Sequence, residues 1–224
     1  MKNSTKFLIL AAVFFAGLQL KAQDINASLE PFKEVKTFRG IEVIVFPSEE
    51  NRITITGHSK EKVKYEVVEG RLEIKLPIDN IWSDDNTLIK VYGDAIEIID
   101  ANEGSRVQVE NKIEGNKITF RAQEGASIES AVEAEKVVVK VISGGKITLE
   151  GRAREQQVET NTGGIYYGKD LKTKHTDVSA GTAGRAEVFA TKYCKASARI
   201  GGIVHIFGSP DKVDHKTSLG GKIL

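Results

Sequence analysis

The sequence is poor in the residues that cross-link small proteins or bind metals. Its 224 residues include one cysteine, one tryptophan, one methionine and four prolines. A single cysteine excludes an internal disulfide framework and a cysteine-rich zinc site. The HExxH, GxSxG and P-loop motifs are absent, so the usual signatures of metalloproteases, serine hydrolases and nucleotide-binding proteins are missing. The 32 basic and 31 acidic residues nearly balance, which gives no reason to expect nucleic acid as a partner.

A long apolar run occurs only near the first residue. Residues 7–20 are apolar or small except for Gln19, and they follow Lys2 and Lys6. This order is typical of a signal peptide, and the run is too short for a membrane-spanning helix. We expect residues 1–23 to be removed by cleavage near Gln23; the alternative is a buried helix. No cysteine stands at the cleavage site for lipidation. The prediction is export to the periplasm, the outer-membrane surface or the medium, without a transmembrane anchor.

The rest of the chain has the pattern of β-strands. Apolar residues alternate with polar ones at period two, as in Val43 and Val45 or Leu72 and Ile74, and β-branched residues dominate. Turn residues punctuate the runs. The expected fold is all-β, with an antiparallel meander over residues 35–76. Residues 131–136 are the one helix-prone piece, and they alternate as well.

Residues 78–87 interrupt the strands with an acidic loop. The loop contains Asp79, Asp84 and Asp85, which could supply oxygen ligands to calcium. It lacks the ligand spacing and the bend glycine of an EF-hand. We therefore expect a plain surface loop.

The second half contains a repeat marked by small residues. Its corners are expected at Gly125-Ala126, Gly144-Gly145, Gly163-Gly164, Ala183-Gly184, Gly201-Gly202 and Gly220-Gly221, spaced 18 to 20 residues apart. Two places beyond each pair stand Ile128, Ile147, Tyr166, Ala186, Val204 and Ile223. Seven, five and three places before the pairs stand three further columns, which begin with Val137, Val139 and Val141. The residues between these columns are mostly polar.

Equal coils explain this repeat, because stacking places like residues above like. Glycine tolerates positive φ, which suits a sharp corner. The spacing fits neither a hexapeptide β-helix nor a calcium-binding nonapeptide repeat. We predict one all-β domain over residues 24–224, in which leading strands (about 32–124) run into an irregular parallel β-solenoid of roughly 19-residue coils (125–224). The alternative is an antiparallel sandwich with coincidental spacing.

The order of short motifs resembles a known exported family. These motifs are Phe32-Lys33-Glu34-Val35, Gly40-Ile41-Glu42-Val43, Glu69-Gly70-Arg71-Leu72-Glu73-Ile74, Gly208-Ser209-Pro210 and Ser218-Leu219-Gly220-Gly221. They resemble the domain of unknown function described as "putative auto-transporter adhesin, head GIN domain" over nearly the whole mature chain. The resemblance implies a right-handed β-helix, export and a Gram-negative source. It implies no catalytic residue and no ligand.

Candidate chemical groups are few, and we expect no metal and no cofactor. Cys194 falls in an inward column, so we expect a small buried hydrophobe rather than a nucleophile or a metal ligand. His175 with Asp177 could form a base and its orienting group. His205 and His215 could join a metal cluster, but they occupy different columns, His205 an outward one and His215 an inward one in the last full coil, where burial ends.

A polysaccharide-acting enzyme would need a pair of carboxylates. Glu159, Asp170, Asp177 and Glu187 are available near the coils, and their spacing selects no pair. Tyr166 and Tyr167 could stack on a sugar ring, but we expect one of them to fill the core.

We therefore expect a non-enzymatic adhesion or binding module of the cell envelope whose partner is a glycan, an anionic polymer or an envelope protein. Residues 163–224 contain ten basic and five acidic residues, whereas residues 24–162 contain 19 and 26. This polarity could steer an anionic partner, or it could reflect two solvated faces. The alternatives are a carbohydrate-active enzyme and a structural protein that self-associates end to end through open strand edges.

Overall fold

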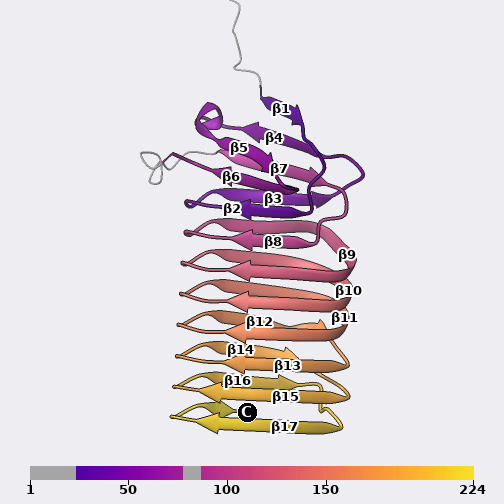
Figure 1. The fold of residues 1–224 in the computed structure, drawn as a ribbon, viewed down its shortest axis with the longest axis vertical. Coiled ribbons are helices and arrows are strands. Elements are labelled where there is room, and N and C mark those ends of the chain that lie inside the picture. The colour runs from indigo at the N-terminus through magenta and orange to yellow at the C-terminus, as the bar shows by residue number, and fades with distance from the viewer. Residues whose placement is uncertain (1–23, 78–86) are drawn as a thin grey trace, which may run out of the picture.

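The structure is a computed structural model that describes residues 24–77 and 87–224 as a tall stack of β-coils (Figure 1). Residues 1–23, the predicted signal peptide, and nearly all of the acidic loop lie outside the described residues. The strands are β1 (Ile25–Ser28), β2 (Glu34–Thr37), β3 (Glu42–Pro47), β4 (Arg52–Thr56), β5 (Lys64–Val68), β6 (Arg71–Lys75), β7 (Leu88–Gly93), β8 (Ile98–Ala101), β9 (Arg106–Ala122), β10 (Ser127–Val141), β11 (Lys146–Thr160), β12 (Ile165–Lys172), β13 (His175–Ala180), β14 (Arg185–Phe189), β15 (Tyr193–Arg199), β16 (Ile203–Phe207), β17 (Lys212–Ser218) and β18 (Lys222–Ile223). A single 3₁₀ turn, Lys60–Lys62, joins them in the described part.

Successive coils pair in parallel and in the register that the repeat predicts. Ile128 lies beside Ile147, which lies beside Tyr166, and the column continues through Ala186 and Val204. The column that contains Cys194 is confirmed in the same way, because Thr176 and Val213 flank it. One wall of the stack runs from β12 through β14 and β16 to β18, and the other from β13 through β15 to β17. In β9, β10 and β11 one long strand bends to contribute to both walls.

Each coil turns at a corner that needs two small residues for different reasons. At the corner between β10 and β11, Ser143 and Gly144 both have positive φ, +50° and +73°. The second glycine, Gly145, has ordinary φ. A Cβ there would lie 2.4 Å from the carbonyl oxygen of Ala122 in the coil above, well inside van der Waals contact. Glycine at the first place therefore relieves backbone strain, and glycine at the second place admits the neighbouring coil.

The antiparallel meander expected over residues 35–76 is only partly correct. β5 and β6 do pair antiparallel, as do β1 with β4 and β4 with β7. However, β2 pairs in parallel with both β6 and β8, and β3 pairs in parallel with β7 and β9. Parallel stacking thus begins at β2. Period-two alternation fixes which face of a strand is buried, but it carries no information on the direction of the neighbouring strand.

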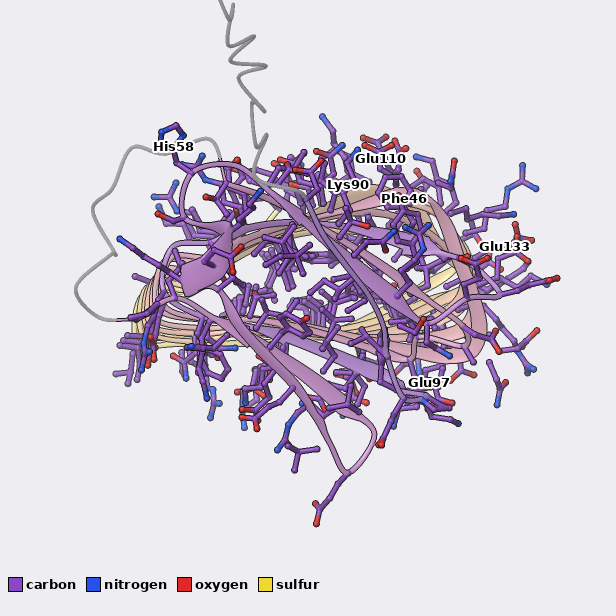
Figure 2. The ribbon with its side chains drawn as sticks, turned by 90° about the horizontal axis from the view of Figure 1, so that it is seen from above. Phe46, His58, Lys90, Glu97, Glu110 and Glu133 are labelled. Carbon is purple, nitrogen blue, oxygen red and sulfur yellow. The ribbon has the colours of Figure 1, made fainter. Side chains whose placement is uncertain are left out.

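The interior is filled by the inward side chains of both walls (Figure 2). Phe120, Ile128 and Ile147 are fully buried in the middle coils. Toward the C-terminal end the same columns hold Ala186, Ala196 and other small residues, so each coil buries less apolar surface. Charged side chains such as Glu97 and Glu133 point outward in Figure 2. No helix among the described residues is long and apolar enough to cross a membrane.

Candidate binding surface

One outer wall of the stack carries regular columns of polar side chains. We call it the ladder face: the solvent-facing side of the C-terminal halves of β9, β10 and β11, continued by β13, β15 and β17. Parallel pairing aligns these columns at every coil. The first column is Thr119, Val138, Gln157, Asp177, Lys195 and Asp214, and the second is Arg121, Lys140, Glu159, Ser179, Ser197 and Lys216. The alternation seen in the sequence therefore becomes a rigid polar lattice.

A shallow groove of about 430 Å³ crosses this ladder face. Its charged lining residues are four cations, Lys117, Arg121, Lys140 and Arg199, and two anions, Glu159 and Asp177. Thr119, Gln157, Asn161 and Ser179 line it as well and supply hydroxyl and amide groups. The groove thus offers a cationic surplus among hydrogen-bonding side chains, most of which, apart from Asn161, stand on strands.

Contacts between coils fix several of these side chains. The Lys195 ammonium lies 3.6 Å from a carboxylate oxygen of Asp177, one coil away. The Tyr193 hydroxyl donates a hydrogen bond of 2.9 Å to Asp214, whose carboxylate also lies 3.2 Å from the Lys212 ammonium. The bond to Tyr193, followed by the contact with Lys212, holds the pKa of Asp214 below its ordinary value. The same bond raises the pKa of Tyr193.

The prediction that Cys194 is a buried hydrophobe is confirmed. The side chain is fully buried between the two walls. Burial, and secondarily the charge of Asp177, raises the pKa of the thiol to about 11. A thiol that stays protonated and is covered by neighbouring coils is a poor nucleophile and a poor metal ligand.

The histidines do not gather into a site. His175 is half-buried, and its Nδ1 has no hydrogen-bond partner among the described residues, so Asp177 does not orient it. His205 is exposed on the opposite wall, where its ring lies 4.3 Å from that of Phe207. His215 is exposed on β17. Within residues 24–77 and 87–224, no group of three or more His, Cys, Asp or Glu side chains is placed to hold a metal ion.

The structure brings two of the four candidate carboxylates to one place. Glu159 and Asp177 both line the groove on the ladder face. Asp170 lies elsewhere and contacts Lys172 at 3.7 Å, and Glu187 lies on the opposite wall between Tyr167 and His205. Both groove carboxylates are solvent-exposed. A general acid is usually kept protonated by an apolar pocket, and this surface provides none for them.

Of the two neighbouring tyrosines, Tyr166 fills the core and Tyr167 is 37% exposed, as expected. The polar cluster around Tyr166 was not predicted from the sequence. Its hydroxyl donates to Gln156 Oε1 at 3.0 Å, and Gln156 Nε2 donates to Thr176 and to the carbonyl oxygen of Phe189. Burial raises the pKa of Tyr166 above its usual range. Two adjacent polar residues in one inward column, Gln156 and Thr176, were the signal that could have revealed this cluster.

The family described as "putative auto-transporter adhesin, head GIN domain" matches residues 31–210. The chain belongs to this family. Family membership was implied by the motif order and is confirmed by this match over most of the described residues. No curated protein matches the chain at a significant level.

Solved structures share the fold of this family member at low sequence identity. A crystal structure titled "putative adhesin", from Bacteroides fragilis NCTC 9343, superposes with a TM-score of 0.81 at 15% identity, covering 90% of this chain and 95% of that one. Another "putative adhesin", from Parabacteroides distasonis ATCC 8503, gives 0.71 at 18% identity with the same coverage. A "putative lipid binding protein" from the latter organism gives 0.69 at 12% identity, again with 90% and 95% coverage. At these identities the likeness shows the fold alone.

Proposed function

We propose that the protein is an exported, non-enzymatic binding module of the cell envelope that acts as an adhesin through its ladder face. Membership of a family described as an adhesin supports this function, as does a surface built for contact rather than for chemistry. The observation that carries the proposal is the groove, where cations outnumber anions and hydroxyl and amide groups stand between them. The partner that fits is an acidic polysaccharide, whose hydroxyls and carboxylates or sulfates match these donors.

Rigidity is what makes such a surface useful in adhesion. Most groove side chains stand on strands that are paired on both edges, so little backbone freedom is lost on binding. Each single contact is exposed and weak, but a polymer that spans several coils repeats it and gains affinity by multivalency. A long glycan should therefore bind much better than its fragments.

Binding can be measured by titrating the protein with polygalacturonate and dextran sulfate, with neutral dextran for comparison, at low salt. We expect Lys140→Glu and Arg199→Glu each to weaken binding at least fivefold. Lys174→Glu makes the same charge change outside the groove and should have little effect. Failure of both acidic polymers to bind, or equal losses in all three variants, would argue against the ladder face as the binding site.

A carbohydrate-active enzyme is the second candidate, because Glu159 and Asp177 share the groove. Such an enzyme would release new reducing ends from a bound polysaccharide, and both Glu159→Gln and Asp177→Asn would abolish this release. The binding proposal predicts that polymers remain intact on prolonged incubation. Release of reducing ends by the parent protein but by neither variant would favour the enzyme over the binding proposal.

Export is part of the same proposal and depends on residues 1–23. Expression in a Gram-negative host should yield a mature chain that begins close to Asp24. Intact mass spectrometry of the envelope and medium fractions checks this start. Recovery of the full-length chain from the cytoplasm alone would contradict export.

A further inference from the structure

Strand β17, the last full strand of the ladder face, presents an outer edge that faces away from the coils (Figure 1). β17 pairs in parallel with β15 along its whole length. All seven of its residues are exposed. Val213, His215 and Thr217 continue inward columns whose members in the coil above, including Cys194 and Ala196, are buried. Within the described residues, these three side chains therefore occupy core positions according to the strand register, but they are exposed to solvent.

We propose that two copies of this chain associate tail to tail by antiparallel pairing of β17 with β17, about a two-fold axis at His215. In this register Asp214 lies opposite Lys216 of the second copy, and Lys216 lies opposite Asp214 of the second copy. Val213 lies opposite Thr217 on the inward side, Lys212 lies opposite Ser218, and the two His215 residues meet at the axis. The strand is thus complementary in charge to its own reversed copy.

This register is the one that pairs all seven residues of β17, and charge disfavours the registers with the axis one residue to either side. Moving the axis to Asp214 would place two aspartates opposite each other and Lys212 opposite Lys216. Moving it to Lys216 would place two lysines opposite each other. Like charges directly opposite each other across a pair of strands are destabilising. An axis placed between two residues would pair inward-facing residues with outward-facing ones, which the pleat of the strands forbids.

The geometry of Asp214 supports the pairing. Its carboxylate is held on the outward side by the Tyr193 hydroxyl and the Lys212 ammonium. The lowered pKa of Asp214 keeps this carboxylate ionised at neutral pH. Lysine on an edge strand usually discourages pairing with another chain. Here, in the two-fold register, each Lys216 instead meets an anion, so the protective charge becomes an attractive one.

The opposite end of the stack is a poor partner for this edge. There the antiparallel strands β1, β4 and β5 and the Lys60–Lys62 turn close over the coils, and Val63 is buried beneath them. Among the described residues the inward positions at that end are covered, as the buried Ile53 and Ile55 show. Tail-to-tail association uses the same surface twice and closes as a dimer, whereas head-to-tail association would continue into a fibre.

A charge swap tests the proposal in solution. Sedimentation of the mature chain over increasing concentration should show a monomer–dimer equilibrium. We expect Asp214→Lys and Lys216→Asp, each alone, to weaken the dimer at least tenfold. The double variant should recover most of the affinity, because lysine and aspartate again stand opposite each other. Glu150→Lys, an exposed change of the same sign in the middle of the stack, is the matched control.

A monomer at every concentration, a fibre, or a double variant as weak as the single ones would overturn the two-fold register. Far-UV circular dichroism checks that each variant remains folded. The charge changes lie at exposed positions of the end coil, so we expect the fold to survive them.

A cysteine at the axis provides a second, independent test. Residues directly opposite across an antiparallel pair have Cα atoms about 4.5–5.5 Å apart, within the range for a disulfide. Under oxidised glutathione, His215→Cys should therefore link two chains. Thr217→Cys faces Val213 of the second copy and should link at least tenfold less. Equal linking at both positions, or none at His215→Cys, would contradict the axis. Cys194 is buried and does not interfere.

Discussion

The corners near the N-terminal end and those near the C-terminal end obey different rules. At the second corner place, Ile41, Ser105 and Ala126 carry buried side chains. From Gly145 onward every equivalent residue is glycine, and an added Cβ would lie 2.1–2.7 Å from a carbonyl carbon or oxygen of the preceding coil at these corners. Coils in the second group therefore approach more closely at the corner. The pair of glycines marks this close approach as well as the turn.

The interiors of the two groups differ in parallel with their corners. The column that begins with Val139 continues through Val158 and Val178 and then reaches Ala196. Close corners thus accompany small core residues. Because burial of apolar surface is the main favourable contribution to stability, the C-terminal coils depend more on exact backbone fit than on bulk. Substitutions can test this difference directly.

The largest effect is expected from Gly164→Ala. Its new Cβ would lie 2.2 Å from the carbonyl oxygen of Val141, so the two coils must separate. We expect a loss of at least about 2 kcal/mol in the free energy of unfolding, as for other overpacked sites. Urea denaturation followed by circular dichroism measures it.

Gly163→Ala is the matched control for this corner. Gly163 has a φ of +73° with open space around it, so only backbone strain, about 1–2 kcal/mol, is added. Ala183 already occupies the same place in the next coil at a φ of 59°. If Gly163→Ala proves as costly as Gly164→Ala, close approach is not what requires the second glycine.

A smaller effect is expected from Tyr166→Phe. The change removes the hydroxyl that donates to Gln156 Oε1 and leaves a buried acceptor without this donor. The expected cost is about 1–2 kcal/mol. Tyr167→Phe, on the exposed neighbour, should stay within about 0.5 kcal/mol. Thermal melting compares the two; a Tyr166→Phe protein as stable as the parent would show that the polar cluster contributes little.

At neutral pH the smallest effect is that of the Cys194 ionisation, because its contribution appears only at alkaline pH. Burial raises the pKa of this thiol from 9.0 to about 11. Between these values the unfolded chain releases the proton and the folded chain keeps it, so the free energy of unfolding falls as pH rises. Cys194→Ala should lack this part of the slope. Thiol labelling at pH 8 offers a companion measurement: it should be slow in the native protein and stoichiometric in denaturant. Rapid native labelling would contradict the buried position.

Much of the solenoid could be predicted from sequence because coil stacking converts spacing into contact. The columns through Ile147 and Cys194 follow from glycine spacing alone. For Tyr166 the sequence left two roles open, filling the core or stacking on a sugar ring. The direction of the strands that pair with β2 and β3 could not be predicted, because period-two alternation is the same for parallel and antiparallel neighbours. The groove could not be predicted either. It depends on how side chains from several coils are arranged around one hollow, from Lys140 on β10 to Arg199 on β15.

The corners also align the electric dipoles of the backbone. The amide of Gly40 donates to Glu103, that of Gly104 to Glu124, and that of Gly125 to Ser143, and the series continues coil by coil to Gly201 and Leu219. Every N–H group in this row of hydrogen bonds points toward the C-terminal end. The neighbouring rows, in which the amides of Ser127 and Lys146 donate to Ser105 and Ala126, point the other way, so their dipoles largely cancel that of this row. Bonds in such a row polarise one another. Loss of one peptide N–H from the row should therefore weaken the hydrogen bonds of the coils on both sides of it.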